Sequence, residues 1–213
     1  MSLQFSLKLI NEQDMQRQIL IAMRKHLKQN FKKEAEHFSN FAGANILKAI
    51  LDSPTVRELE SGELREELGL VNGAHAMEQI ALGIVSSYSL TMQEPRISGN
   101  KITATIKLEA VPLDLSEFHN IAEQVTEKGQ KLPWFKWLTT LGDAIIVKDF
   151  EVQAGFPKSS RTGDKIMVEG KGWRVPPEHA GFEANNFITR AVDDVAPLIE
   201  KWAMYYFTQA LGV

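Results

Sequence analysis

Apolar side chains recur every three or four positions along the first part of the chain, which predicts a long amphipathic helix. Asn11 is expected to cap this helix, which runs to about residue 38 and can continue to Leu51. Its apolar side comprises Ile19, Leu20, Met23, Leu27, Phe31 and Phe38. Ahead of the helix, the alternation in "LQFSLKLI" predicts a short strand at residues 3–10.

The next region contains helix-breaking residues at short intervals, namely Pro54, Gly62 and Gly69. After Pro54, the stretch "SPTVRELESGELREELGL" predicts two short helices that are hinged at Ser61 and Gly62 and closed by Gly69. Residues 74–82 predict a further helical turn or two. This part of the chain is therefore expected to be helical and compact.

The apolar period then shortens toward two, which favours strands. Residues 84–94 and 101–111 are rich in β-branched side chains, and "PRISGN" between them has turn chemistry, so an antiparallel hairpin is predicted. A second hairpin is predicted from "DAIIVKDFEVQA" and "KIMVEGKGWRVP", which are joined by the loop "GFPKSSRTGD". We expect this loop, at about 155–165, to be mobile.

Three further helices complete the pattern. One is predicted from Asp114 to about Glu127, a short aromatic one after Pro133, and a final one beginning near Asn185 or Asn186 with a kink at Pro197. The order of elements predicts one α+β domain over residues 1–213, in which an antiparallel sheet of two hairpins packs on long amphipathic helices.

Composition narrows the class of protein. The 213 residues suit one domain, and the absence of cysteine excludes disulfides, thiolate metal sites and cysteine nucleophiles. No run approaches the roughly 18 to 20 apolar residues that span a bilayer, and the N-terminus does not resemble a signal peptide. The net charge of −3 argues against a globally basic nucleic-acid binder but allows basic patches.

Motifs for catalysis and metal binding are incomplete. Glu34 and His37 have the spacing of a di-iron helix site, but the second Glu-x-x-His that such a site needs is missing from the sequence. Ser98 and Lys101 match Ser-x-x-Lys but fall in a predicted hairpin turn, and glycine-rich nucleotide loops are missing. We therefore expect no catalytic, cofactor-binding or metal-binding residues, and no enzymatic activity.

One enzymatic alternative stays open at this point. His179, which follows two prolines, is a candidate proton-transfer residue with Glu178 or Glu183, as in a small hydrolase. The ordinary interpretation is a loop histidine that caps or spaces the chain.

Basic residues cluster on one face of the first helix and in the second hairpin loop. The helix face comprises Arg17, Arg24, Lys28 and Lys32, with no acidic residue between Asp14 and Glu34. The loop contributes Lys158, Ser159, Ser160, Arg161 and Lys165. Solvated surfaces explain both patterns, but a sequence-independent nucleic-acid-binding protein is the alternative, with the helix face toward the phosphates of duplex DNA.

Four stretches resemble the neck or tail-completion proteins of tailed bacteriophages: "SPTVRELESGELREELGL", "LPWFKWLTTLGDAIIV", "SRTGDKIMV" and "GWRVPPEHAGFEANNFITRAV". The resemblance covers about residues 53–70 and 131–192, and does not extend to 1–50 or 84–111. It implies an α+β virion protein, assembled in the host cytoplasm, whose copies form a ring of six or twelve around the DNA channel. The implied partners are portal or adaptor, other neck, and tail proteins, without membrane contact.

The resemblance also assigns structural roles to the segment before the last helix. Trp173 and Phe187 would be packing residues, and Asn185 or Asn186 would cap the helix. Pro176, Pro177 and Gly181 would set the geometry of the turn; independently of the resemblance, two prolines fix two φ angles and withhold two donors, which ends strand pairing. The loop at 155–165 would be a docking or channel-lining element with Lys158 and Arg161 at its tip.

Overall fold

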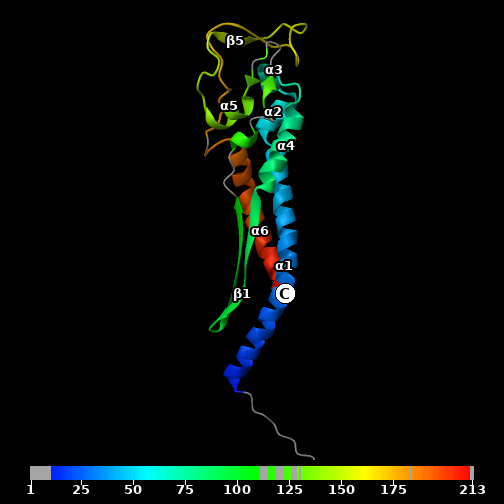
Figure 1. Cartoon of the computed structure of the whole chain (residues 1–213), viewed down its shortest axis with the longest axis vertical. Coiled ribbons are helices and arrows are strands. Elements are labelled where there is room, and N and C mark those ends of the chain that lie inside the picture. The colour runs from blue at the N-terminus through cyan, green and yellow to red at the C-terminus, as the bar shows by residue number, and fades with distance from the viewer. Residues whose placement is uncertain are drawn as a thin grey trace, which may run out of the picture. The chain divides into compact units, whose positions relative to one another are not determined.

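The computed structural model describes residues 11–110, 115–118, 122–125, 129, 131–182 and 184–211 (Figure 1). These residues form α-helices and small antiparallel two-stranded sheets, so the predicted α+β class is confirmed. Their contacts define two compact units. The first holds the described residues up to Phe41, with Ser89–Glu109 and those from Glu200 on; the second holds Ala42–Tyr88 and the described part of Ala110–Ile199.

The predicted long helix is confirmed as α1 (Glu12–Leu51). The side-chain oxygen of Asn11 caps it, accepting hydrogen bonds from the backbone N–H groups of Gln13 at 2.7 Å and Asp14 at 3.1 Å. In the first unit, the later part of α1 packs on the last turns of the final helix, where Phe41 and Trp202 have ring centroids 5.1 Å apart.

The predicted apolar side of α1 is only partly buried. Leu27, Phe31 and Phe38 are buried, but Ile19 and Met23, on the same predicted side, are 52% and 46% exposed. Helical periodicity shows that side chains share a face but not whether another element covers that face.

The first predicted hairpin consists of β1 (Tyr88–Ser98) and β2 (Lys101–Ala110). The expected start at residue 84 was wrong, because α4 (Gly73–Ser86) continues that far and buries Ile84. The turn is also shorter than "PRISGN": it consists of two residues, with Gly99 at a φ of 57°. Pro95 lies within β1, where a two-stranded sheet tolerates a residue that lacks an N–H donor.

The second unit begins with α1 from Ala42 onward, followed by α2 (Pro54–Ser61), α3 (Glu63–Leu68) and α4. The two short helices hinged at Ser61 and Gly62 are confirmed, and Gly69 closes α3 in the left-handed conformation at φ 61°. Glycine adopts this conformation without steric cost, which explains why the helix ends there.

The predicted helix from Asp114 to Glu127 was wrong where the chain is described. Leu115–Phe118 form a 3-10 turn, η1, and β3 (Gln124–Val125) pairs with β4 (Lys131–Leu132). Gly129, at φ 77°, lies between these strands. Strand pairing and the burial of Phe118 against the next helix overrode the helical period.

An aromatic cluster forms the centre of the second unit. It is built on α5 (Trp134–Thr140), where Trp134 and Phe135 are buried with their rings edge to face, 5.9 Å apart. Phe135 also meets Phe118 and Phe187 edge to face, at 6.5 and 6.4 Å. Such pairs stabilise beyond simple area burial and fix the position of α5.

The second predicted hairpin is confirmed as β5 (Phe150–Gln153) and β6 (Ile166–Glu169), shorter than the sequence pattern. An isolated bridge between Val147 and Trp173 extends the pairing. The hairpins remain separate two-stranded sheets in the described chain. The last helix, α6 (Phe187–Leu211), contains Pro197 as expected. The strand predicted at residues 3–10 lies outside the described residues.

Candidate docking site

The turn before α6 is held by backbone hydrogen bonds and one close approach. The carbonyl of Pro176 accepts from the N–H groups of His179 at 2.9 Å and Ala180 at 3.0 Å. A side chain at Gly181 would place its Cβ 2.5 Å from the carbonyl oxygen of Leu138, closer than real contacts allow. Glycine is therefore required by packing at this point.

Asn186 is the N-cap of α6. Its side chain is fully buried, and its Oδ1 accepts from the backbone N–H groups of Ile188 at 3.0 Å and Thr189 at 3.2 Å. The Thr189 hydroxyl in turn accepts from the Asn186 N–H at 2.8 Å. This reciprocal pair satisfies three donors that the helix start would otherwise leave open. Asn185 is exposed; its side-chain oxygen accepts from Arg190 at 3.1 Å, and its backbone exchanges two hydrogen bonds with Phe182.

The His179 side chain is packed inside the second unit, beside α2. Its ring is buried, and Nδ1 lies 3.1 Å from the hydroxyl of Thr55, which is itself buried on α2. His179 does not line the cavity described below. Glu178 is exposed, and Glu183 lies outside the described residues. The hydrogen bond to Thr55 thus ties the turn to α2, and the alternative of a hydrolase that uses His179 stays a prediction.

Lys165 fastens the loop at 155–165 to α3. Its ammonium lies 3.0 Å from Glu63 and 3.1 Å from Glu67, and its side chain is only 16% exposed. Burial disfavours the charged form, but the hydrogen bonds to the two glutamates outweigh it and raise the pKa of Lys165. Glu67 also accepts from Nε1 of Trp173 at 3.1 Å. The Glu67 carboxylate on α3 therefore binds both the loop, through Lys165, and the segment after β6, through Trp173.

Other residues of the loop have different environments. Arg161 donates to the carbonyl of Val125 at 3.3 Å, and Ser160 accepts from the N–H of Gly163 at 3.2 Å. Lys158 and Ser159 are exposed. Of the predicted tip residues, Lys158 is exposed to solvent, whereas the Arg161 guanidinium donates to β3 at Val125. The mobility of the loop stays a prediction.

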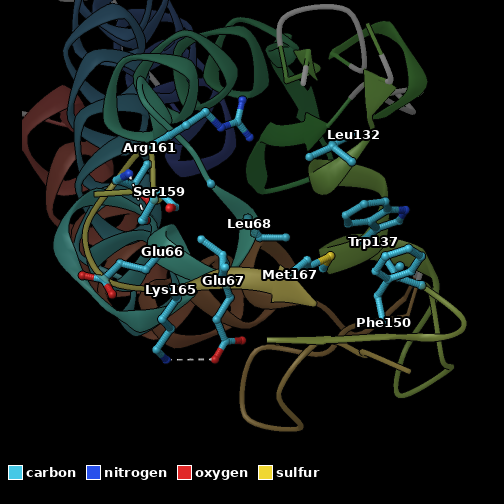
Figure 2. Close-up of a pocket in the computed structure, with 15 residues that line it drawn as sticks. Glu66, Glu67, Leu68, Leu132, Trp137, Phe150, Ser159, Arg161, Lys165 and Met167 are labelled. Carbon is cyan, nitrogen blue, oxygen red and sulfur yellow. Dashed lines mark hydrogen bonds and ion pairs between the residues drawn. The ribbon is translucent and has the colours of Figure 1, made fainter. Parts of the chain in front are cut away.

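Beneath this loop lies a cavity of about 470 Å³, within the second unit (Figure 2). Its apolar wall includes Leu68, Leu132, Trp137, Phe150, Ile166 and Met167. Figure 2 shows Trp137, Phe150 and Met167 gathered on one side, with Glu66 and Arg161 elsewhere on the lining. Phe150 and Met167 are 45% and 38% exposed, so this wall is open to an incoming side chain.

The cavity could not be found from charge patterns, because its main residues are apolar. Phe150 and Met167 come from two strands separated by the loop, and Trp137 comes from α5. The only signal in the sequence was the position of aromatic and apolar residues on both sides of a basic loop. That signal does not distinguish a cavity wall from ordinary core.

The basic face of α1 is partly engaged by the hairpin of the first unit. Nε of Arg24 donates to the carbonyl of Pro95 at 2.9 Å, and the ammonium of Lys28 lies 2.9 Å from Glu94. The hydrogen bond from Lys28 lowers the pKa of Glu94. Arg17 and Lys32 are exposed. Two of the four predicted residues therefore hold β1 against α1.

The described residues that line the cavity are apolar side chains with a few charged and polar ones among them. Within the described ranges, no three His, Asp or Glu side chains are grouped to hold a metal ion. None of the described helices is long and apolar enough to cross a bilayer. Apolar walls with a few polar groups are typical of sites that accept a ligand or a partner's side chains.

Comparisons with protein-family models, curated proteins and solved structures find no match to this chain.

Proposed function

We propose that this chain is a non-enzymatic structural protein of a tailed-bacteriophage virion. In this proposal, copies assemble into a ring at the head–tail junction, as a neck, tail-completion or terminator protein. The ring connects the portal or its adaptor to the tail and surrounds the DNA channel.

The observation that carries the proposal is where the resembling segments lie in the fold. Residues 53–70 and 131–192 both fall in the second unit, where they supply α2, α3, α5, β5, β6 and the start of α6. The first unit is built largely from residues without that resemblance, namely the early part of α1, the β1–β2 hairpin and the end of α6. The resemblance therefore describes one compact unit and not scattered motifs.

The surface of the second unit is consistent with assembly. An open wall that exposes Phe150 and Met167 beside a tethered loop is the kind of apolar patch that marks protein–protein contact. Packing explains why residue 181 is a glycine, and capping of α6 explains why residue 186 is an asparagine. Both residue types are therefore accounted for by the structure of the turn.

The alternative, a sequence-independent DNA-binding protein, has one favourable observation. Residues 15–33 of α1 contain six basic and no acidic side chains. However, Arg24 and Lys28 are already bonded to β1, which reduces the charge available to phosphates. A DNA contact as part of a ring is compatible with the remaining charges.

The solution mass of the purified protein, measured by light scattering over a concentration series with and without duplex DNA, tests the proposal. A discrete species of six or twelve copies without DNA is the expected result. A monomer that binds duplex DNA with a steep salt dependence would favour the alternative. A monomer that does not bind DNA at any concentration would contradict both the ring proposal and the DNA-binding alternative.

A further inference from the structure

The cavity beneath the loop at 155–165 has charged residues on its lining, and some of these charges are already paired. The charged lining residues are Glu66, Glu67, Arg161 and Lys165. The Lys165 ammonium lies 3.0 Å from Glu63 and 3.1 Å from Oε1 of Glu67. The other oxygen of Glu67 accepts from Nε1 of Trp173 at 3.1 Å. The charge that the cavity offers to a ligand therefore depends on the two remaining residues, a glutamate and an arginine.

These two residues are placed differently with respect to the apolar wall. The Glu66 carboxylate occupies the position that a Cβ of Gly163 would take, and Figure 2 shows it directed away from the aromatic side of the cavity. The Arg161 guanidinium lies over the end of α3, where a Cβ on Gly69 would be 2.7 Å from its Nη2. In Figure 2 this group extends toward the side on which Leu132 lies. The charge nearer the apolar wall is therefore positive.

The loop presents hydrogen-bond donors at the same place. Nη1 of Arg161 donates to the carbonyl of Val125 at 3.3 Å, and this is the hydrogen bond described for a side chain with five N–H donors. Oγ1 of Thr162 is buried and has no hydrogen-bond partner among the described residues. The Ser160 hydroxyl accepts from the N–H groups of Thr162 and Gly163, at 3.4 and 3.2 Å, so its own hydrogen is left to donate. Three consecutive lining residues thus offer donors to the cavity.

The unpartnered hydroxyl and the apolar wall both point to a ligand. Buried polar groups are nearly always hydrogen-bonded, so Thr162 is an exception that calls for an explanation. A ligand acceptor would supply the missing partner, and a negative charge on it would be attracted by Arg161 more strongly than in bulk water, because the apolar wall lowers the local dielectric. The cavity volume of about 470 Å³ lies within the range of about 300–1,000 Å³ that is typical of small-molecule sites.

We propose that this cavity is a binding site for an anionic amphiphile, meaning a small molecule with a compact apolar body and one carboxylate, sulfonate or phosphate group. The anionic group accepts hydrogen bonds from Ser160, Arg161 and Thr162. The body packs on the open wall formed by Phe150 and Met167. All these residues belong to one chain, so the inference goes beyond the proposed ring function and does not depend on it.

Two fluorescent probes that share one aromatic body test the site. Anilinonaphthalene sulfonate carries a sulfonate, whereas phenylnaphthylamine is the same body without it. Fluorescence titration of the full chain gives a dissociation constant for each probe. We expect the sulfonate probe to bind about tenfold more tightly, because its hydrogen bonds to a guanidinium are charge-assisted. Equal affinities, or tighter binding of the neutral probe, would refute the anion-binding end of the site.

Arg161→Gln shows where the sulfonate probe binds. Arg161 is exposed, so the fold is expected to tolerate the substitution. This variant should bind the sulfonate probe about tenfold more weakly and the neutral probe as before. The matched control is Lys158→Gln, which removes the same charge from an exposed position of the same loop that does not line the cavity. The control should change the affinity by less than about twofold.

Two results with these variants would overturn the site. Unchanged binding of the sulfonate probe to Arg161→Gln would place the probe elsewhere on the chain. Equal losses in Arg161→Gln and Lys158→Gln would indicate that the net charge of the loop attracts the probe, without a defined site.

Thr162→Val tests the unpartnered hydroxyl by a measurement that does not involve the probe. The substitution removes a buried oxygen that lacks a partner, so the thermal midpoint of the free protein should stay the same or rise. The sulfonate probe should bind about threefold more weakly, because one neutral hydrogen bond is lost. A lower midpoint would show that the hydroxyl already has a partner within the folded chain, and unchanged probe affinity would exclude it from the site. Either result would contradict the proposed geometry.

Discussion

Replacing Asn186 with alanine tests whether the turn before α6 is held as the structure describes. The substitution removes the Oδ1 acceptor for the N–H groups of Ile188 and Thr189, at 3.0 and 3.2 Å, and the amide donor to the carbonyl of Phe182 at 3.2 Å. The site is fully buried, so water cannot easily replace these partners.

The expected loss of stability follows from two contributions. Removing an N-cap asparagine costs about 0.5–2 kcal/mol. Leaving buried donors without an acceptor costs about 1–3 kcal/mol more. The two terms overlap, because the cap is itself the acceptor, so we expect Asn186→Ala to lower the free energy of unfolding by about 2–4 kcal/mol.

Urea denaturation followed by circular dichroism measures this loss, provided that the slope against denaturant stays unchanged. Asn185→Ala is the matched control, since the side chain of this neighbouring asparagine is exposed and the hydrogen bond described for it is the one it accepts from Arg190; its effect should stay below about 0.5 kcal/mol. If the two variants lose equal stability, or if Asn186→Ala loses less than about 0.5 kcal/mol, the assigned cap is wrong.

Three further predictions concern other contacts. Gly181→Ala should lower the free energy of unfolding by about 1–3 kcal/mol, because its Cβ would lie 2.5 Å from a carbonyl oxygen; an unchanged thermal midpoint would contradict this. Lys165→Met should cost about 1–2 kcal/mol at pH 7. Because the folded pKa of Lys165 is raised, its contribution is full below pH 10.5 and is lost as the pH rises through the folded pKa, so an alkaline stability series should show a fall that Lys165→Met lacks. By carboxyl NMR titration, Glu94 should have a pKa below 4.5 that rises in Lys28→Ala; no rise would refute the ion pair.

The elements with strong local signals were predictable from the sequence. Asn11 marked the start of α1, Gly69 marked the end of α3, and the β-branched runs marked the β1–β2 and β5–β6 hairpins. Each signal depends on residues close together in the chain, such as a cap with its first turn or a glycine at positive φ. Such interactions do not require knowledge of the tertiary fold.

The failures involve competition from distant residues. The helical period of 114–127 gave way to pairing between Gln124 and Leu132, and α4 continued past residue 82 because Ile84 is buried. Ile19 and Met23 have the period of core residues but are exposed. In each case the deciding factor is which other segment packs against the residue, and periodicity does not contain that information.

The loop that borders the candidate site could be named from the sequence, but the cavity beneath it could not, and the docking role of the loop stays a prediction. The loop at 155–165 was expected to dock onto a partner, and it borders the cavity. The pairing of Lys165 with Glu63 and Glu67 joins positions about a hundred residues apart, and the bond from Arg24 to Pro95 likewise depends on the fold. Free charges and paired charges therefore look alike in the sequence.

Electron microscopy of the purified, unmodified protein at increasing concentration would show whether copies of this chain close into a ring. We expect particles that average to a closed ring with a central opening and six-fold or twelve-fold symmetry. Particles that remain single chains at every concentration, or that grow into open filaments, would contradict it.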